Sequence, residues 1–276
     1  MAAMQPATIT RGDATVAWRP TPWDADGLGV AATLELTSIT GADPAALAAA
    51  LAEVDAVAAA CGAALVTTRV AAADVPVRAA LDAAGYAAVE RSHPLTLDLA
   101  GLDPARLRRT VAVDDATAAD AAALADLAGD GFDYSRFHED PRIHPSRARA
   151  RYRRWIVDSL GNGDTVWVHR RAGAVVALMS FRRRGPAVTL LLGGCLRELG
   201  LIAPMFWAGV LARLRADGVT TITTRVSAAN AGALRLHLAL DFVVAGDDVG
   251  ATKLYDAPAL ASPLPPRAGP TTAERT

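Results

Sequence analysis

One pattern occurs twice in this chain of 276 residues, and it constrains the fold more than any other feature. The segment TTRVAAADVPVRAALDAAGY, residues 67–86, aligns without a gap with TTRVSAANAGALRLHLALDF, residues 223–242. In each copy a β-branched run precedes a helix-capping residue, Asp74 or Asn230, and a helical pattern follows it. We therefore predict a strand, cap and helix unit in both halves of the chain.

Strand and helix patterns alternate along the rest of the sequence, which predicts an α/β protein with a mixed sheet. In the first half we expect strands at 31–36, 65–70 and 93–99 and helices at 44–60 and after Asp74. In the second half we expect a helix within 114–128 that begins behind an N-cap at Thr117, helices at 147–160, 203–215 and after Asn230, and strands at 165–170, 174–183, 187–194, 220–226 and 252–255. The Gly, Pro and basic residues of GLDPARLRRT, from Gly101, mark the best domain boundary.

These patterns predict three parts of the chain. Residues 1–100 form a partial domain, residues 101–258 form a full domain, and the Pro-rich residues 259–276 form a disordered tail. The apolar stretch 44–66 is interrupted by Glu53 and Asp55, so we expect a soluble helix rather than a membrane span.

Charge and cysteine content exclude some classes of protein. A net charge of −1 gives no overall attraction to nucleic acid or to an anionic membrane, although the basic run 147–154 leaves salt-dependent nucleic-acid binding as an alternative. His138 and His144 are six residues apart and do not fit a metal-binding helix, so we expect no metal. Cys61 and Cys195 lie far apart outside any CxxC motif, so we expect reduced, buried thiols. Without a secretory signal pattern, this favours the cytoplasm.

The pattern N-x-x-A-x-x-L-x-x-x-L-x-F from Asn230 to Phe242, with the order of elements before it, resembles the acyl-CoA-dependent GNAT acetyltransferase fold. Two further segments, 134–160 and the Trp-Asp…Gly motif at 23–29, are similar to dTDP-fucosamine (dTDP-4-amino-4,6-dideoxygalactose) acetyltransferases. The resemblance covers roughly residues 20 to 256. It implies a partial GNAT-like half followed by a full GNAT domain.

Acetyl-CoA or another short acyl-CoA is the co-substrate that this resemblance implies. GNAT proteins carry [Q/R]-x-x-G-x-[G/A] at the pyrophosphate loop, and this chain has Arg197-x-x-Gly200-x-Ile202, where Ile202 is larger than expected. An ordinary loop glycine also explains Gly200, and capping alone explains Asn230. The implied cofactor-binding residues are Leu192, Gly193, Gly194, Arg197, Gly200, Ile202, Ala203 and Asn230.

His237 stands where the family has a Tyr that protonates the leaving thiolate, so the resemblance implies that it is the catalytic acid. An imidazole with a pKa of ~6.5 is a stronger acid than a phenol at ~10, although a His in an apolar helix is also explained as a partly buried polar residue. Asp241 replaces the usual Gly before the final aromatic residue and tolerates positive φ better than most residues. In the first copy Leu81 aligns with His237, so we expect that half to be a scaffold or to shape the acceptor site.

The acceptor side, by the same resemblance, comprises Tyr134, Ser135, Arg136, Phe137, His138 and Arg154. The general base is left open between His138, Glu139 and a water chain. We expect direct transfer of an acetyl or short acyl group to a small-molecule amine, with a nucleotide-linked amino sugar as the first candidate. The alternative is a degenerate, non-catalytic GNAT-like binding module, and assembly of several copies is left open.

Overall fold

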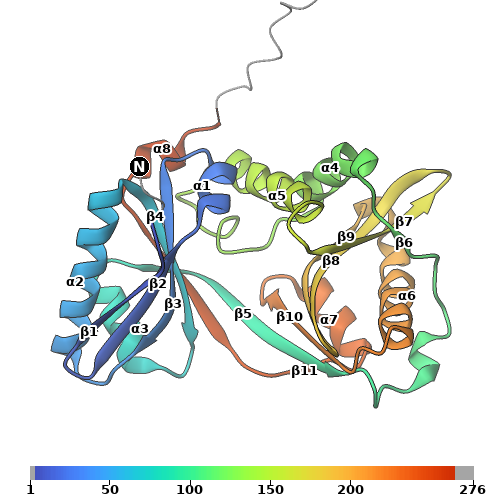
Figure 1. The fold of residues 1–276 in the computed structure, drawn as a ribbon, viewed down its shortest axis with the longest axis horizontal. Helices are drawn as coiled ribbons and strands as arrows, with labels where there is room; N and C mark the ends of the chain where they lie inside the picture. Colours follow the sequence, from blue (N-terminus) through green and yellow to red (C-terminus); the bar gives the residue numbers. More distant parts are fainter. Residues whose placement is uncertain (1–3, 265–276) are drawn as a thin grey trace, which may run out of the picture.

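The computed structural model describes residues 4–264 (Figure 1). Its strands join in one mixed sheet in the order β1-β2-β3-β4-β12-β5-β10-β9-β8-β7-β6, and β11 pairs with β5. The strands are β1 (Ala7–Arg11), β2 (Ala14–Pro20), β3 (Ala32–Thr40), β4 (Ala63–Ala71), β5 (Ala87–Asp98), β6 (Asp114–Asp115), β7 (Thr165–Arg171), β8 (Ala174–Arg184), β9 (Ala187–Cys195), β10 (Thr221–Ser227), β11 (Val243–Val244) and β12 (Asp248–Leu254). The predicted mixed α/β sheet is confirmed.

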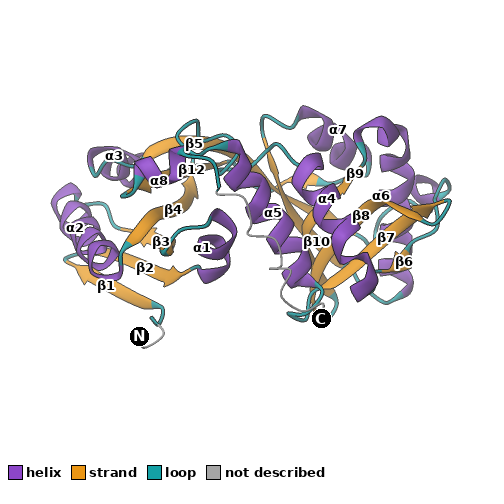
Figure 2. Cartoon of the chain, turned by 90° about the horizontal axis from the view of Figure 1, so that it is seen from above, coloured by secondary structure: helices purple, strands orange, loops and turns teal. Residues whose placement is uncertain are grey.

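Helices flank this sheet in two lobes (Figure 2). The α-helices are α1 (Pro22–Leu28), α2 (Pro44–Cys61), α3 (Val75–Ala83), α4 (Ala121–Gly131), α5 (Pro145–Ser159), α6 (Ala203–Ala216), α7 (Ala231–Ala239) and α8 (Ala257–Ala261). Short 3₁₀ helices occur at η1 (Pro104–Leu107), η2 (Ala118–Asp120) and η3 (Arg197–Ile202). The predicted N-cap at Thr117 is confirmed: it forms a capping box with Asp120 at the start of η2, and α4 follows from Ala121.

Helix α2 illustrates how local sequence sets the elements. The Asp43 carboxylate accepts the N–H groups of Ala45 and Ala46 at the start of the helix, and Gly62 ends it in the left-handed region. The helix is long and apolar enough to cross a membrane by length and composition, with a mean hydropathy of 1.5, as is the segment Arg197–Ala216. Leu47 and Leu51 are nevertheless fully buried in the core of the first lobe, as in a core helix of a globular protein.

The two lobes exchange strands. Strand β12, from the end of the chain, lies between β4 and β5, where it completes the first lobe. The second part of β5 crosses to the other lobe and pairs with β10 from Ser92 to Asp98, with β11 on its other edge (Figure 1). Each lobe is thus completed by a strand from the other half of the sequence.

Helices α1 and α5 also join the lobes, and they lie side by side in Figure 2. They approach so closely at Gly27 that a Cβ there would lie 2.7 Å from Arg151 Cα. Arg151 Nε donates to the buried Asp24 carboxylate at 2.7 Å, and Arg147 donates to the carbonyls of Leu28 and Gly29. The basic helix α5 therefore holds the two lobes together, and two of its arginines, Arg147 and Arg151, are buried rather than solvated.

The duplicated unit is present as predicted. Asp74 caps α3 by accepting the N–H of Val77 at 3.2 Å, and Asn230 caps α7 by accepting that of Ala233 at 3.0 Å. Asp241 has the positive φ of 62° expected at the position where the first copy has a Gly.

The sheet continues across the predicted boundary at Gly101, which follows β5 in the chain, and the division into two domains stays a prediction. Residues 259–264 of the predicted disordered tail are ordered, because α8 buries Leu260 completely against the first lobe. Residues 265–276 of that tail lie outside the described residues.

Candidate functional site

The main cavity opens where two parallel strands separate. The pairing of β9 with β10 runs from Ala187 and Thr221 to Thr189 and Thr223 and then ends. Just beyond, the register of β9 with β8 shifts, so that Leu191 is an extra residue in a β-bulge that bends the strand. The cavity, of about 510 Å³, is lined by β9 from Leu190 to Cys195 and by β10 from Thr224 to Ser227.

Both faces of the sheet contribute walls to this cavity. On one face lie the first turns of α6 and α7, including Ala203, Pro204 and Asn230. On the other face lie Tyr152 and the loop from Gly131 to Tyr134. The cavity therefore passes between the separated strands, and ligands can meet within it from opposite faces.

The first turn of α6 has no side-chain cap among the described residues. It continues the 3₁₀ helix η3, so the Ala203 N–H donates to the Gly200 carbonyl oxygen, and Pro204 has no N–H to offer. No acidic side chain caps this turn, so it is compatible with an anion at the cavity wall. In the first lobe, carboxylates cap the N-terminus of α2, the helix that corresponds to α6. There Asp43 caps α2, and Asp13 accepts the N–H groups of Ala42 and Asp43, which lowers the pKa of the Asp13 carboxyl.

Seven of the eight predicted cofactor residues line the cavity: Leu192, Gly193, Gly194, Arg197, Gly200, Ala203 and Asn230. Ile202 does not; its side chain packs against the core of the second lobe, so it leaves the cleft clear. Arg197 lies at the cavity wall in an ion pair with Asp133. No atom lies within 4 Å of a Cβ built on Gly200, so space alone does not require a glycine there.

Gly193 and Gly194 have a packing role. A Cβ on Gly193 would lie 2.7 Å from Met179 Cε and 2.8 Å from Trp207 Cζ2. A Cβ on Gly194 would lie 2.8 Å from the ring of Phe132 on the opposite face. The two glycines thus let large side chains lie directly against β9 beside the cavity.

His237 lines the cavity but is only 5% exposed. Its Nδ1 lies 2.8 Å from the carbonyl oxygen of Ala233, and its Nε2 lies 3.4 Å from Nε1 of Trp207. Because an indole N–H can only donate, Nε2 must accept and the ring proton is on Nδ1. Burial lowers the pKa of the imidazole, so the neutral ring is favoured. The resting ring directs no proton into the cavity, so this geometry does not favour the predicted role as acid.

Among the six predicted acceptor residues, Tyr134 lines the cavity and is 45% exposed. The other five do not line it. Ser135 is buried and hydrogen-bonds His138, and Phe137 belongs to a separate core cluster that joins the lobes. Arg154 is on the surface, where it pairs with Asp158.

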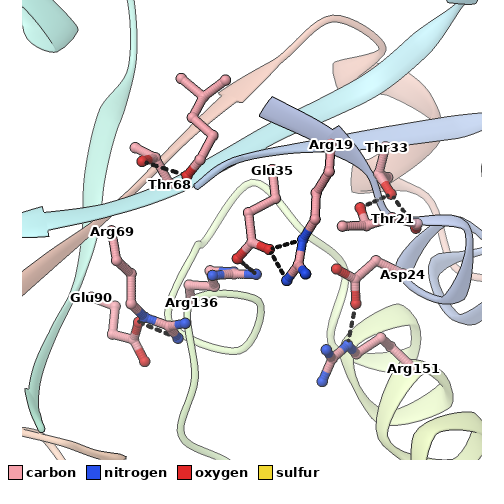
Figure 3. Close-up of polar contacts among 11 residues, drawn as sticks. Arg19, Thr21, Asp24, Thr33, Glu35, Thr68, Arg69, Glu90, Arg136 and Arg151 are labelled. Atoms are coloured by element: carbon pink, nitrogen blue, oxygen red, sulfur yellow. Dashed lines mark hydrogen bonds and ion pairs between the residues drawn. The ribbon is translucent and has the colours of Figure 1, made fainter. Parts of the chain in front are cut away.

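Arg136 lies at the junction of the lobes in a cluster of buried charges (Figure 3). Its Nη2 donates to Glu35 at 3.3 Å, while burial and the neighbouring Arg69 lower the pKa of its guanidinium to about 10. Arg69 in turn pairs with the buried Glu90 at 2.8 Å. Arg136, predicted on the acceptor side, therefore lies in a charge cluster at the junction of the lobes and outside the lining of the cavity.

Glu139, one of the open candidates for a base, is half-buried beside the cavity. Burial raises the pKa of its carboxyl, and this is partly offset by the side chain of Ser227, which lines the cavity. Its Oε1 is buried and has no hydrogen-bond partner within the described part of the chain. By contrast, burial lowers the pKa of His138 to about 4, and its ring packs edge-on against Tyr152.

Nucleophilic and metal chemistry have little support in these side chains. Burial, reinforced by Glu198, raises the pKa of the Cys195 thiol, which disfavours the reactive thiolate. Cys61 and Cys195 are free and only half-buried, so the expectation of buried thiols is corrected. Residues 4–264 contain no group of three or more His, Cys, Asp or Glu side chains that could hold a metal ion.

No family model and no curated protein matches this sequence. Solved structures do match its fold. A GCN5-related N-acetyltransferase from Kribbella flavida is 16% identical, covers 90% of each chain and has a TM-score of 0.57. A protein from Staphylococcus epidermidis of unknown function is 10% identical over 90% of this chain and 94% of the other, with a TM-score of 0.62.

A tandem GNAT protein from the clavulanic acid biosynthesis pathway is 17% identical. The match covers 95% of this chain and 86% of that one, with a TM-score of 0.54. The chain therefore has the GNAT fold, in a two-lobed form like that of tandem GNAT proteins. At these identities the likeness concerns the fold, and the finer resemblance to dTDP-fucosamine acetyltransferases stays a prediction.

Proposed function

We propose that this protein is an acyl-CoA-dependent N-acyltransferase that moves an acetyl or other short acyl group to a small-molecule amine in the cytoplasm. One observation carries the proposal: the cavity between the separated strands β9 and β10 continues to an α6 N-terminus that has no side-chain cap within the described chain. In the GNAT fold of the second lobe this combination would give an acyl-CoA both a place for its anionic end and an apolar slot.

The residues of the cavity fit an acyl-CoA in chemical character. Amides in the first turn of α6 would hold the pyrophosphate, with the Arg197 guanidinium nearby to supply positive charge. The separated edges of β9 and β10 would accept the pantetheine arm, because their backbone groups beyond Thr189 and Thr223 are released from each other. When bound, acyl-CoA supplies an activated thioester carbonyl for attack by an amine.

Glu139 is our choice for the group that accepts the proton of the amine. A raised carboxyl pKa brings a base closer to neutral pH, and Ser227 connects it to the cavity wall. The low pKa of His138 and its contact with Tyr152 make that residue the weaker base. The thiol of Cys195 stays protonated, which favours direct transfer over a covalent enzyme intermediate.

The acceptor would enter from the face that carries Tyr134 and Tyr152. Phenol rings at that mouth suit contact with a sugar or a ring system. A nucleotide-linked amino sugar is the narrower proposal, and it rests on the resemblance of residues 134–160 to dTDP-fucosamine acetyltransferases.

The proposal is tested by calorimetry with acetyl-CoA, followed by a thiol-release assay with a panel of amines and mass spectrometry of the products. We expect binding of acetyl-CoA and acylation of at least one amine, with turnover reduced in Glu139→Gln. Failure to bind acetyl-CoA would refute the enzyme assignment. Binding without acylation of any amine would favour the alternative, a non-catalytic GNAT-like module.

A further inference from the structure

Trp207 forms an apolar wall of the cavity. This residue of α6 is 5% exposed and lines the cavity together with Met179 of β8. A Cβ built on Gly193 would approach both side chains within 3 Å, at 2.7 Å from Met179 and 2.8 Å from Trp207. The indole and the thioether therefore lie against the backbone of β9 and close the space between that strand and α6.

The indole is held in place from two sides. Phe206 packs edge-on against it at 5.7 Å between ring centroids, and His237 does the same at 6.1 Å. The indole N–H donates to Nε2 of His237 at 3.4 Å. His237 is itself fixed, because its Nδ1–H donates to Ala233 one turn earlier and Phe242 packs edge-on against its ring at 4.9 Å.

This arrangement gives His237 a structural role, as a hydrogen-bond acceptor, that requires no proton transfer. The neutral tautomer offers an acceptor to the only polar atom of Trp207, and an unpaired indole N–H in this buried setting would be costly. A Leu or Phe at residue 237 would fill space without satisfying that N–H. An acceptor for this indole N–H accounts for a buried His in an Ala- and Leu-rich helix, although the buried indole N–H groups of Trp18 and Trp167 have no such partner among the described residues.

We propose that Trp207, positioned by His237, limits the acyl group that this protein accepts to about the size of acetyl. The inference rests on the proposed function, because it assigns the apolar part of the cavity to the acyl end of acyl-CoA. The indole and the thioether already lie against β9 at Gly193, and close-packed protein interiors respond to a single added methylene. An acyl group longer than acetyl must therefore displace the indole or stay out of this part of the cavity.

The test measures the dissociation constants of CoA, acetyl-CoA, butyryl-CoA and hexanoyl-CoA for the full chain by calorimetry, without an acceptor. We expect the ratio of the hexanoyl-CoA to the acetyl-CoA constant to exceed ~10, the discrimination that one or two methylenes give in an apolar pocket. In Trp207→Ala and in the milder Trp207→Leu this ratio should fall about tenfold. An unchanged ratio in a folded Trp207→Leu protein would refute the proposal, as would equal binding of all acyl-CoAs by the original chain.

His237 is tested with a matched pair of variants. Gln at this position can still accept the indole N–H, so His237→Gln should keep the chain-length selectivity, whereas His237→Leu should lose it. If His237 were instead the proton donor, both variants would lose kcat with acetyl-CoA and neither would change the selectivity. Absence of binding of CoA itself would contradict the proposed function, whereas binding without chain-length discrimination would contradict only the role of Trp207.

Discussion

The ion pair between Asp24 and Arg151 offers the sharpest test of how the two lobes are joined. The Asp24 residue is 2% exposed, the Arg151 side chain is 9% exposed, and Nε lies 2.7 Å from Oδ1. Arg151→Met keeps an apolar stem beside Trp155 but leaves the Asp24 carboxylate buried without its cation. Breaking a buried pair in this way costs about 3–5 kcal/mol of unfolding free energy, a large share of the ~5–15 kcal/mol typical of a folded protein.

The measurement is urea unfolding followed by tryptophan fluorescence and circular dichroism. Arg154→Met is the matched control on the same helix, because Arg154 is 47% exposed and pairs with Asp158 at the surface, so it should cost less than about 1 kcal/mol. The double variant Asp24→Asn/Arg151→Met removes both charges and should recover part of the loss. Equal costs for Arg151→Met and Arg154→Met would refute the reasoning. A double variant as unstable as the single one would show that packing, rather than charge, is what Arg151 provides.

Three further predictions follow from single positions. Asn230→Ala and Asp74→Ala each remove a helix cap and should each cost about 0.5–2 kcal/mol in urea unfolding, but only Asn230→Ala should also weaken CoA binding in calorimetry, because only Asn230 lines the cavity. Asp241→Gly should raise the unfolding free energy by up to about 1 kcal/mol, since a φ of 62° costs a glycine less than other residues, and an unchanged or lower value would contradict this. The pKa of His138 falls from 6.5 to about 4 on folding, so the unfolded chain binds more protons between these values and stability is lost as the pH falls through them. This loss amounts to about 2 kcal/mol between pH 7 and about pH 5, and it should be absent in His138→Asn.

The sequence predicts the local elements well because their signals are local. Asp74 and Asn230 are strong caps, and the repeated β-branched run precedes each of them, so both copies of the unit form as expected. No comparable local signal in the sequence predicts that the two lobes exchange strands. The alternation in β5 and β12 indicates strands but does not say which neighbours they pair with, and that choice depends on packing between residues far apart in the chain.

The site was predictable only where a resemblance supplied positions. Gly193 and Asn230 line the cavity as the GNAT pattern implies, whereas Trp207 looks like any core residue of an apolar helix. Five of the six residues predicted to bind the acceptor do not line the cavity, and there is a physical reason for this. A loop rich in Arg, His and aromatic side chains suits ligand recognition, but the same residue types also build a buried junction, and Arg136 and Phe137 do the latter.

The duplicated unit also explains why one lobe carries the candidate site and the other does not. In the first lobe the pairing of β3 with β4 continues to Leu36 and Thr68, and Thr68 Oγ1 donates to the Leu36 carbonyl oxygen at 3.1 Å. In the second lobe backbone pairing ends one residue earlier in the aligned sequences, and the equivalent Thr224 donates across a wider 3.4 Å to Leu190. The α2 N-terminus is also capped by carboxylates, whereas the α6 N-terminus has no side-chain cap within the described residues. Yet the first half of the chain cannot be dispensable, because its strand β5 pairs along β10 and thereby holds the strand whose separation from β9 creates the cavity.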